Sequence, residues 1–151
     1  MSTKIVPVSE ENEQEWALMW AEISRELWDD TDACAEDFLV ERSNGNYPHE
    51  FLYNENNEAV AFISLSLRRD YVEGTDSSPV GYLEGIFVKP AFRSRGIAKE
   101  LFLFAKKWAI SQGCTELASD CELDNEISKL FHMQLGFKEA NCIICYTMDL
   151  T

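Results

Sequence analysis

The stretch that decides the fold of this chain is Glu84-Gly-Ile-Phe-Val88-Lys-Pro90-Ala-Phe-Arg93-Ser-Arg95-Gly96-Ile-Ala98. Its first part has the composition of an apolar β-strand, and Pro90 ends the strand because proline has no N–H to give to a sheet. Two arginines and a glycine follow, and the pattern then predicts a helix that begins near Arg95. Backbone N–H groups at the start of a helix lack partners within it and carry partial positive charge. The stretch therefore predicts a turn that binds an anion such as a phosphate.

Two common phosphate-binding patterns do not fit this turn. The Walker pattern places a lysine and then a serine or threonine after its second glycine, whereas Gly96 is followed by Ile97 and Ala98. The dinucleotide-binding pattern needs three glycines in a fixed order, and only Gly96 is present in the turn. The turn is therefore expected to belong to a third type of phosphate-binding motif.

The chain has the size and composition of one folded domain. It has 151 residues, of which 46% are hydrophobic and 26% charged, so residues 1–151 are expected to form a single domain. The 13 basic and 27 acidic residues give a net charge of -14, which disfavours nucleic acid and anionic membranes as partners and favours a cationic one. The alternative interpretation of the acidic charge is that it only keeps the protein soluble.

Cysteine and histidine usage indicates neither a disulfide framework nor a metal site. The chain has five cysteines, an odd number, and no apolar run as long as a membrane-spanning helix, so a cytoplasmic protein is expected. Cys142 and Cys145 have the spacing of a metal-binding pair, but they lie in a strand-like segment, where residues three apart face opposite sides. The two histidines, His49 and His132, complete no zinc-binding set, so no metal is expected.

Hydrophobic spacing predicts alternating strands and helices. Strands are expected at residues 4–8, 51–53, 59–67, 80–88, 115–119 and, as a pair or one long bent strand, 137–150. Helices are expected from Ser9, before Asn44, from near Arg95 to Gly113, and from a cap at Asp124 to Gly136. The apolar faces expected to point to the core carry Trp16, Met19, Trp20, Ile23 and Leu27 in the first helix and Ile127, Leu130 and Phe131 in the last. This order predicts an α/β (mixed α+β) domain whose mixed, mostly antiparallel sheet is flanked by helices.

Two motifs resemble those of the GCN5-related N-acetyltransferase (GNAT) family. Residues 93–98 resemble the R/Q-x-x-G-x-G/A turn that wraps the pyrophosphate of acetyl-coenzyme A, and residues 125–137 resemble the family's closing motif. The resemblance implies acetyl-coenzyme A as co-substrate. The implied coenzyme contacts are Phe87, Val88, Arg93, Ser94, Arg95, Gly96, Ile97, Ala98, Lys99 and Asn125. The resemblance also makes the backbone N–H of Val88 the donor to the oxyanion of the reaction.

Shorter patterns are similar to those of the aminoglycoside 6'-N-acetyltransferases. They lie at residues 69–74, 76–80, 83–86 and 118–120, on the substrate side. The resemblance implies that the chain transfers an acetyl group to the 6'-amine of aminoglycoside antibiotics, which confers resistance. Direct attack by the amine needs no covalent enzyme intermediate. Relatives of this kind are often dimers, so a homodimer is implied by resemblance alone.

The resemblance assigns roles to individual residues. Glu84 and Asp120 are implied catalytic residues that also contact the sugar amines, and a carboxylate acting through water can accept the amine's proton. His132 stands where the family has a tyrosine that protonates the departing thiolate, and it is the third catalytic candidate. Each has an alternative, since Glu84 can pair with an arginine, Asp120 can form a turn or cap a helix, and His132 can be a surface residue. Further substrate contacts are expected from Trp28, Asp32 and Tyr71.

Two other functions remain open from the sequence. An acidic site equally suits a polyamine or a protein amine as acceptor. A non-catalytic acyl-coenzyme A binding module is also consistent, because His132 replaces the family's tyrosine. The acidic residues from Asp29 to Glu41 likewise fit either a lip over a cationic substrate or a solvated helix surface.

Overall fold

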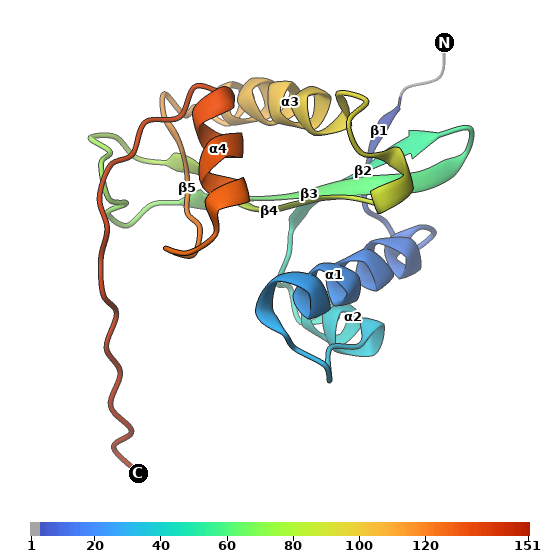
Figure 1. The fold of residues 1–151 in the computed structure, drawn as a ribbon, viewed down its shortest axis with the longest axis horizontal. Helices are drawn as coiled ribbons and strands as arrows, with labels where there is room; N and C mark the ends of the chain where they lie inside the picture. The colour runs from blue at the N-terminus through green and yellow to red at the C-terminus, as the bar shows by residue number, and fades with distance from the viewer. Residues whose placement is uncertain (1–3) are drawn as a thin grey trace.

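A five-stranded sheet in the order β1-β2-β3-β4-β5 forms the centre of the computed structural model, which describes residues 4–151 (Figure 1). Residues 1–3, the first three of the expected domain, lie outside the described part. The strands are β1 (Ile5–Pro7), β2 (His49–Glu55), β3 (Glu58–Arg68), β4 (Val80–Val88) and β5 (Leu117–Ser119). Neighbouring strands are antiparallel except β4 and β5, which are parallel. The predicted mixed, mostly antiparallel sheet is confirmed.

Helices cover both faces of this sheet (Figure 1). They are α1 (Glu13–Trp28), α2 (Ala35–Ser43), the short 3₁₀-helix η1 (Pro90–Phe92), α3 (Ile97–Ser111) and α4 (Glu126–Gln134). Ala61 and Ile63 of β3 pack with α3 in one core, whereas Phe62 packs with α1 in a second core on the opposite face. Successive side chains of a strand point to opposite faces, so β3 supplies both cores.

The first helix differs from its prediction at both ends. Trp16, Trp20 and Ile23 are buried as expected, but Leu27 is half exposed, because the last turn of α1 extends beyond the sheet core. The helix begins at Glu13 rather than at Ser9. Ser9 instead belongs to a turn, in which its N–H donates to Oδ1 of Asn12 at 2.8 Å.

The last helix also differs from its prediction. Asn125, not Asp124, is the N-cap of α4, because its Oδ1 accepts the Ser128 N–H at 3.0 Å. Ile127 and Leu130, expected in the core, are 83% and 63% exposed. The helix lies beside the edge strand β5 rather than across the sheet, so its apolar face meets no core (Figure 1). No helix among residues 4–151 is long and apolar enough to cross a membrane.

The predicted C-terminal strand at residues 137–150 is not formed. This segment contains no helix or strand: Phe137 still packs against Phe102 of α3 and Asn141 bonds to Glu73, and the chain beyond them runs away from the body of the protein (Figure 1). Its apolar residues alternate as in a strand, but Ile144, Tyr146, Met148 and Leu150 are between 78% and 88% exposed. A strand is stable only when a neighbouring strand pairs with its backbone groups. The segment has the alternation of a strand, but no strand of the described chain lies beside it to pair with it.

Candidate active site

A β-bulge in β4 places Glu84 at the site. The ladder between β3 and β4 pairs Ser64 with Gly85 and Leu65 with Leu83, so Glu84 is an extra residue without a partner in β3. Bulges of this kind redirect a side chain out of the regular sheet. Gly85 is required next to it, because a Cβ there would lie 2.8 Å from the Trp20 ring.

The Glu84 carboxylate is held by two neighbours on β3. Nη2 of Arg68 lies 2.9 Å from each carboxylate oxygen, and Oγ of Ser66 donates to Oε2 at 2.5 Å. The pairing of Glu84 with an arginine, one of the two sequence-based alternatives, is therefore present. It leaves Glu84 at the surface of the site, because the Arg68 and Glu84 side chains are 42% and 32% exposed.

The second predicted carboxylate, Asp120, is joined to this pair through Tyr82. The Tyr82 hydroxyl donates a hydrogen bond to Oδ2 of Asp120. Burial and the adjacent carboxylate raise the pKa of Tyr82, so its hydroxyl remains a donor at neutral pH. The Arg68 guanidinium lies 3.4 Å from the centre of the Tyr82 ring. Arg68 thus connects Glu84 with Asp120, and the structure brings the two carboxylates into one cluster.

Strands β4 and β5 separate directly beyond this cluster. They pair only over Gly81–Leu83 and Leu117–Ser119, so the edge of β4 from Glu84 to Val88 has no strand beside it in the described chain. The next N–H, of Lys89, donates to the Val60 carbonyl of β3 at 2.9 Å. Because successive N–H groups of a strand point to opposite sides, the Val88 N–H points to the open edge. It is therefore free to serve a ligand.

His132 lies where β4 and β5 separate. Its Nδ1 is 2.7 Å from the Ser128 carbonyl, which only accepts hydrogen bonds, so Nδ1 carries a proton. Its Nε2 is 2.8 Å from Oγ of Ser119, which also lies 3.2 Å from the Leu83 carbonyl. His132 of α4 therefore contacts the end of β5 through Ser119.

The anion-binding turn lies at the other end of the open edge. Helix α3 begins at Ile97, slightly later than predicted, and its first hydrogen bond joins the Glu100 N–H to the Gly96 carbonyl at 3.0 Å. The N–H groups of the three residues 97–99 therefore have no intrahelical acceptor. Ser94 and Gly96 have φ values of 63° and 83°, a left-handed conformation that reverses the chain between η1 and α3.

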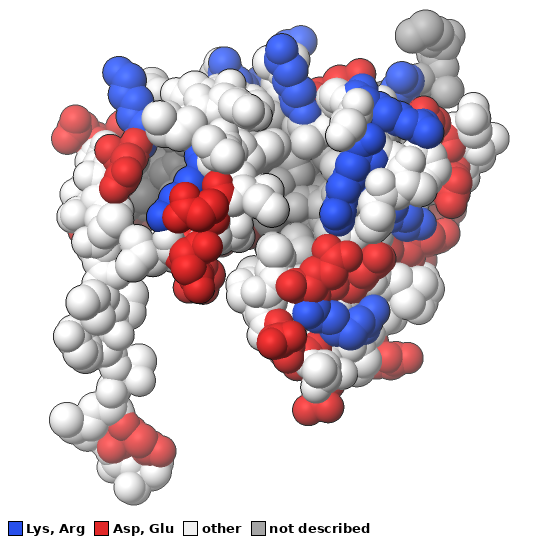
Figure 2. Space-filling view, viewed as in Figure 1, with Lys and Arg blue, Asp and Glu red and all other residues white. Residues whose placement is uncertain are grey.

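The two arginines of the turn are partly neutralised by acidic neighbours. Nε of Arg93 donates to the Val88 carbonyl at 2.8 Å, and its Nη2 lies 3.4 Å from Glu26 of α1. Arg95 lies 3.3 Å from Glu55 at the end of β2. Basic side chains lie over η1 and the start of α3, above acidic ones on α1 (Figure 2). The arginines therefore shape the turn, and its unpaired backbone N–H groups offer the directed contacts to an anion.

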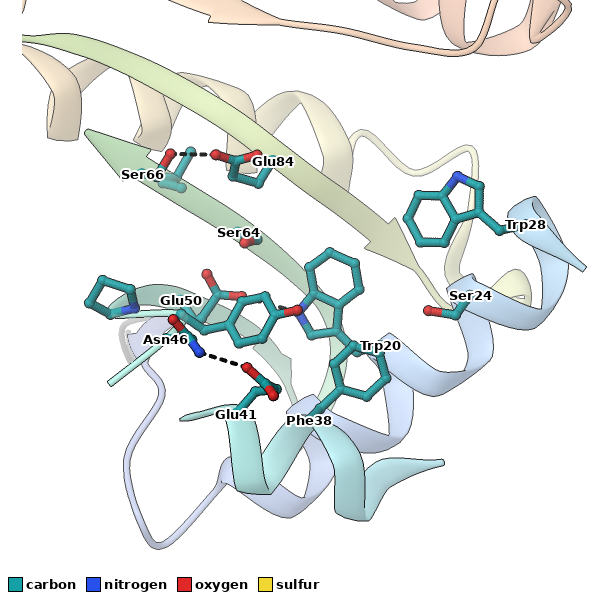
Figure 3. A pocket seen from close by; sticks show the side chains of 13 residues that line it. Trp20, Ser24, Trp28, Phe38, Glu41, Asn46, Glu50, Ser64, Ser66 and Glu84 are labelled. Atoms are coloured by element: carbon teal, nitrogen blue, oxygen red, sulfur yellow. Dashed lines mark hydrogen bonds between the residues drawn. The ribbon is translucent and has the colours of Figure 1, made fainter. Parts of the chain in front are cut away.

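A hollow of about 590 Å³ opens beside Glu84, on the face of the sheet that α1 and α2 cover (Figure 3). We call it the acidic hollow, and its residues include the aromatic Trp20, Trp28, Phe38 and Tyr47 and the carboxylates Glu41, Glu50 and Glu84. Aromatic faces and carboxylates both attract cations. The hollow therefore has the chemistry to bind an ammonium compound.

The residues predicted to contact the substrate lie in different places. Trp28 lines the acidic hollow, and its ring stacks on Trp20 with 6.4 Å between ring centres. Asp32 and Tyr71 are not among the residues that line it. Asp32 is exposed in the turn between α1 and α2, and Tyr71 is 75% exposed in the loop before β4.

Glu50, which sequence reasoning missed, lies at the base of the hollow. Only 3% of it is exposed, and burial raises the pKa of its carboxyl to about 7. Its signal was a glutamate two residues before Leu52 in an alternating strand, a position that faces the core. Among residues 4–151, no three His, Cys, Asp or Glu side chains form a metal-binding group.

Comparison with known proteins identifies the family. Residues 10–137 match the acetyltransferase (GNAT) family. The aminoglycoside N(6')-acetyltransferase type 1 of Acinetobacter haemolyticus is 38% identical over 131 residues, which cover 87% of this chain and 90% of the relative.

Solved structures agree with this match. The apo crystal structure of the aminoglycoside 6'-N-acetyltransferase AAC(6')-IG from Acinetobacter haemolyticus matches with a TM-score of 0.82 and 36% identity, over 99% of this chain and all of that one. AAC(6')-Iy in complex with the bisubstrate analogue CoA-S-monomethyl-acetylneamine also has a TM-score of 0.82, at 34% identity over 96% of this chain and 97% of that one. Together with the separated strands and the anion-binding turn, these matches show that the chain belongs to the GNAT family of acetyltransferases.

Proposed function

We propose that this protein transfers the acetyl group of acetyl-coenzyme A to the 6'-amine of aminoglycoside antibiotics and so confers resistance to them. The observation that carries the proposal is the match to AAC(6')-Iy, which binds an analogue that joins coenzyme A to acetylneamine. The acidic hollow supports it, because an aminoglycoside is a polycation and the hollow combines three carboxylates with four aromatic side chains.

The coenzyme would lie along the open edge of β4. Its pyrophosphate fits the turn of residues 93–99, where three N–H groups of α3 lack acceptors. Its pantetheine arm would lie against the edge that carries Phe87 and Val88, and Asn125 would contact the arm from the other side. The Asn125 side-chain oxygen already caps α4, which leaves its amide NH₂ for the ligand.

The reaction we propose is direct attack of the neutral amine on the thioester carbon. The carboxylates of Asp120 and Glu84 bind the protonated amine, and Asp120 accepts one of its protons through water before the neutral amine attacks. The nitrogen loses its second proton to water as the C–S bond breaks. The Val88 N–H stabilises the oxyanion. His132, at the junction of β4 and β5, delivers a proton to the departing thiolate.

Further substrate contacts would come from the rim of the hollow. Trp28 lines it and fits a sugar ring, whereas Asp32 and Tyr71 would reach the antibiotic only beyond the hollow, on the outer parts of a large ligand. The net charge of -14 favours such a cationic ligand over nucleic acid or an anionic membrane. The five cysteines are all unpaired, which fits a reducing cytoplasm.

We also propose that the chain forms a homodimer through its C-terminal arm, residues 143–151. The arm alternates apolar and polar side chains like a strand, yet its apolar residues are exposed. The outer face of α4 is likewise exposed at Ile127, Leu130 and Met133, as is Leu123 just before the helix. In a two-fold dimer each arm can cover the same apolar patch of the other copy, so one pairing satisfies both chains.

The proposed reaction is tested by following thiol release from acetyl-coenzyme A with four acceptors in parallel. These are tobramycin, a 6'-hydroxyl aminoglycoside, spermidine and a lysine peptide. Turnover with tobramycin alone supports the proposal. Preference for spermidine or the peptide would move the activity to a polyamine or a protein amine, and release with none of them while acetyl-coenzyme A still binds would favour a binding module.

A further inference from the structure

Glu50 of β2 is a buried carboxyl with only one of its two oxygens engaged. The indole N–H groups of Trp16 and Trp20 both donate to Oε1, at 2.9 and 3.1 Å. The other oxygen, Oε2, is buried and makes no hydrogen bond of standard geometry with residues 4–151, although the Ser64 hydroxyl, opposite Glu50 on β3, acts on the carboxyl and lowers its pKa. An acceptor buried in this way is costly unless a donor reaches it.

Within the described part of the chain, no basic side chain is in place to donate to that oxygen. Arg42 of α2 is the basic side chain that acts most on Glu50, but its donors are used elsewhere. Its Nη1 and Nη2 donate to the carbonyls of Tyr47 and Val8, and its Nε lies 3.5 Å from Glu13 of α1. Burial raises the pKa of Tyr47, so the tyrosine beside the hollow is neutral near pH 7.

The remaining charged groups around the hollow are already paired. Glu41 of α2 accepts a hydrogen bond from Asn46 at 2.6 Å, and Glu84 of β4 is held by Arg68. Glu50 lines the same hollow at its base (Figure 3). Of the three carboxylates there, it is the one with a buried oxygen that has no hydrogen-bond partner.

A purely structural role does not need this carboxyl group. The two indole donors fix α1 to β2 through a single oxygen, and an amide oxygen would accept both of them equally well. The second oxygen adds only a desolvation cost to the empty protein. A cationic donor that enters the hollow would remove this cost and form a charge-assisted hydrogen bond.

We propose that Glu50 determines specificity for acceptors that carry several amines: its Oε2 binds a second ammonium group of the acceptor, one that is not acetylated, and so orients the amine that reacts. The inference rests on the proposed function, because it assigns a subsite within the same acceptor site. It predicts that acceptors with two or more amines bind better than an acceptor with a single amine. Because burial raises the pKa of Glu50 to about 7, binding near neutral pH also releases a proton from its carboxyl.

The test uses Glu50→Gln, which retains the acceptor for both indoles and nearly the same shape. With tobramycin, the KM of the variant should rise about tenfold or more while kcat and the KM for acetyl-coenzyme A change little, since one charge-assisted hydrogen bond is lost. With 6-amino-6-deoxyglucose, which has a single amine, kcat/KM should be the same for both proteins. Glu58→Gln serves as the control, because it removes one negative charge at an exposed carboxylate of β3 that does not line the hollow, so its KM for tobramycin should equal that of the wild type.

Calorimetry in buffers of different ionisation enthalpy then measures proton release. Tobramycin binding at pH 7 should release more protons from the wild type than from Glu50→Gln. Three results would each overturn the role of Glu50. They are an unchanged KM for tobramycin in Glu50→Gln, a fall in kcat/KM with the single-amine acceptor as large as that with tobramycin, and equal proton release by the variant and the wild type. Absence of wild-type turnover with every aminoglycoside would instead overturn the proposed function, and this inference with it.

Discussion

Arg68 holds Glu84 with its Nη2 2.9 Å from both carboxylate oxygens, and the same guanidinium lies against the Tyr82 ring. Tyr82 in turn donates to Asp120. One arginine therefore organises both carboxylates that the sequence singled out. Whether Glu84 serves the substrate directly or only positions Arg68 becomes an experimental question.

A double-mutant cycle separates these two roles of Glu84. If Glu84 contacts the aminoglycoside, Glu84→Gln should lower kcat/KM about tenfold or more in the wild type and again in an Arg68→Gln background. If Glu84 only positions Arg68, Glu84→Gln should not lower kcat/KM any further in the Arg68→Gln background. Steady-state kinetics on the four proteins gives the answer, and an unchanged KM for acetyl-coenzyme A shows that the coenzyme site is intact.

Asp120→Asn should reduce aminoglycoside turnover far more than coenzyme binding. The amide cannot accept the proton of the attacking amine, so we expect kcat/KM to fall about a hundredfold or more. Tyr82→Phe is the matched control, since it removes the hydrogen bond to Asp120 but keeps the ring on which Arg68 stacks. An Asp120→Asn variant as active as the wild type would remove this residue from the site.

Gly96→Val should raise the KM for acetyl-coenzyme A. The glycine has φ +83° and a Cβ there would meet no atom within 4 Å, so the effect comes from backbone strain and from bulk on the side of the phosphates. Gly113→Val is the control, because this glycine has φ +87°, equally open surroundings and a place at the other end of α3. Both variants should lose similar stability in thermal melts. If both raise the KM for acetyl-coenzyme A equally, the phosphates of the coenzyme do not bind at the turn of Gly96.

The pH dependence of stability should report Glu50. Burial raises the pKa of its carboxyl from 4.5 to about 7, so the folded protein holds this proton more tightly than the unfolded chain. The stability that Glu50 contributes is therefore fully present below about pH 4.5 and is lost as the pH rises through about 7. In urea unfolding, the stability of Glu50→Gln relative to the wild type should increase between pH 5 and pH 8. If the free energy of unfolding changes with pH in the same way for both proteins, the raised pKa of Glu50 is contradicted.

Removal of the C-terminal arm should leave monomers. A chain that ends at Cys142 loses residues 143–151 but keeps the hydrogen bond of 3.2 Å between Asn141 and Glu73. Light scattering after gel filtration should give a dimer mass for the full chain and a monomer mass for the shortened one. A full chain that is monomeric at all concentrations would refute the arm-mediated dimer.

The features that could be predicted from the sequence are those set by residues close together in the chain. Pro90, the positive φ at Gly96 and the apolar spacing of α3 each act within a few residues, so β4, the anion-binding turn and the helix after it were predicted closely. The strands predicted at residues 51–53, 59–67 and 115–119 correspond to β2, β3 and β5 for the same reason.

Features that depend on distant partners were not predictable. The segment 137–150 has the alternation of a strand, but alternation does not show whether another strand lies beside it. The exposure of Ile127 and Leu130 depends likewise on what covers α4. Glu50 was missed because an isolated glutamate in a strand indicates burial only when Trp16 and Trp20 are known to lie over it.

The central claim is tested most directly by locating the acetyl group on the product. The enzyme is incubated with kanamycin and acetyl-coenzyme A labelled with ¹³C in the acetyl group, and the purified product is examined by two-dimensional NMR. The account predicts one product, in which the labelled carbonyl couples to the protons at the 6'-carbon. A label on any other amine, or no labelled antibiotic while spermidine or a lysine peptide is acetylated, would contradict it.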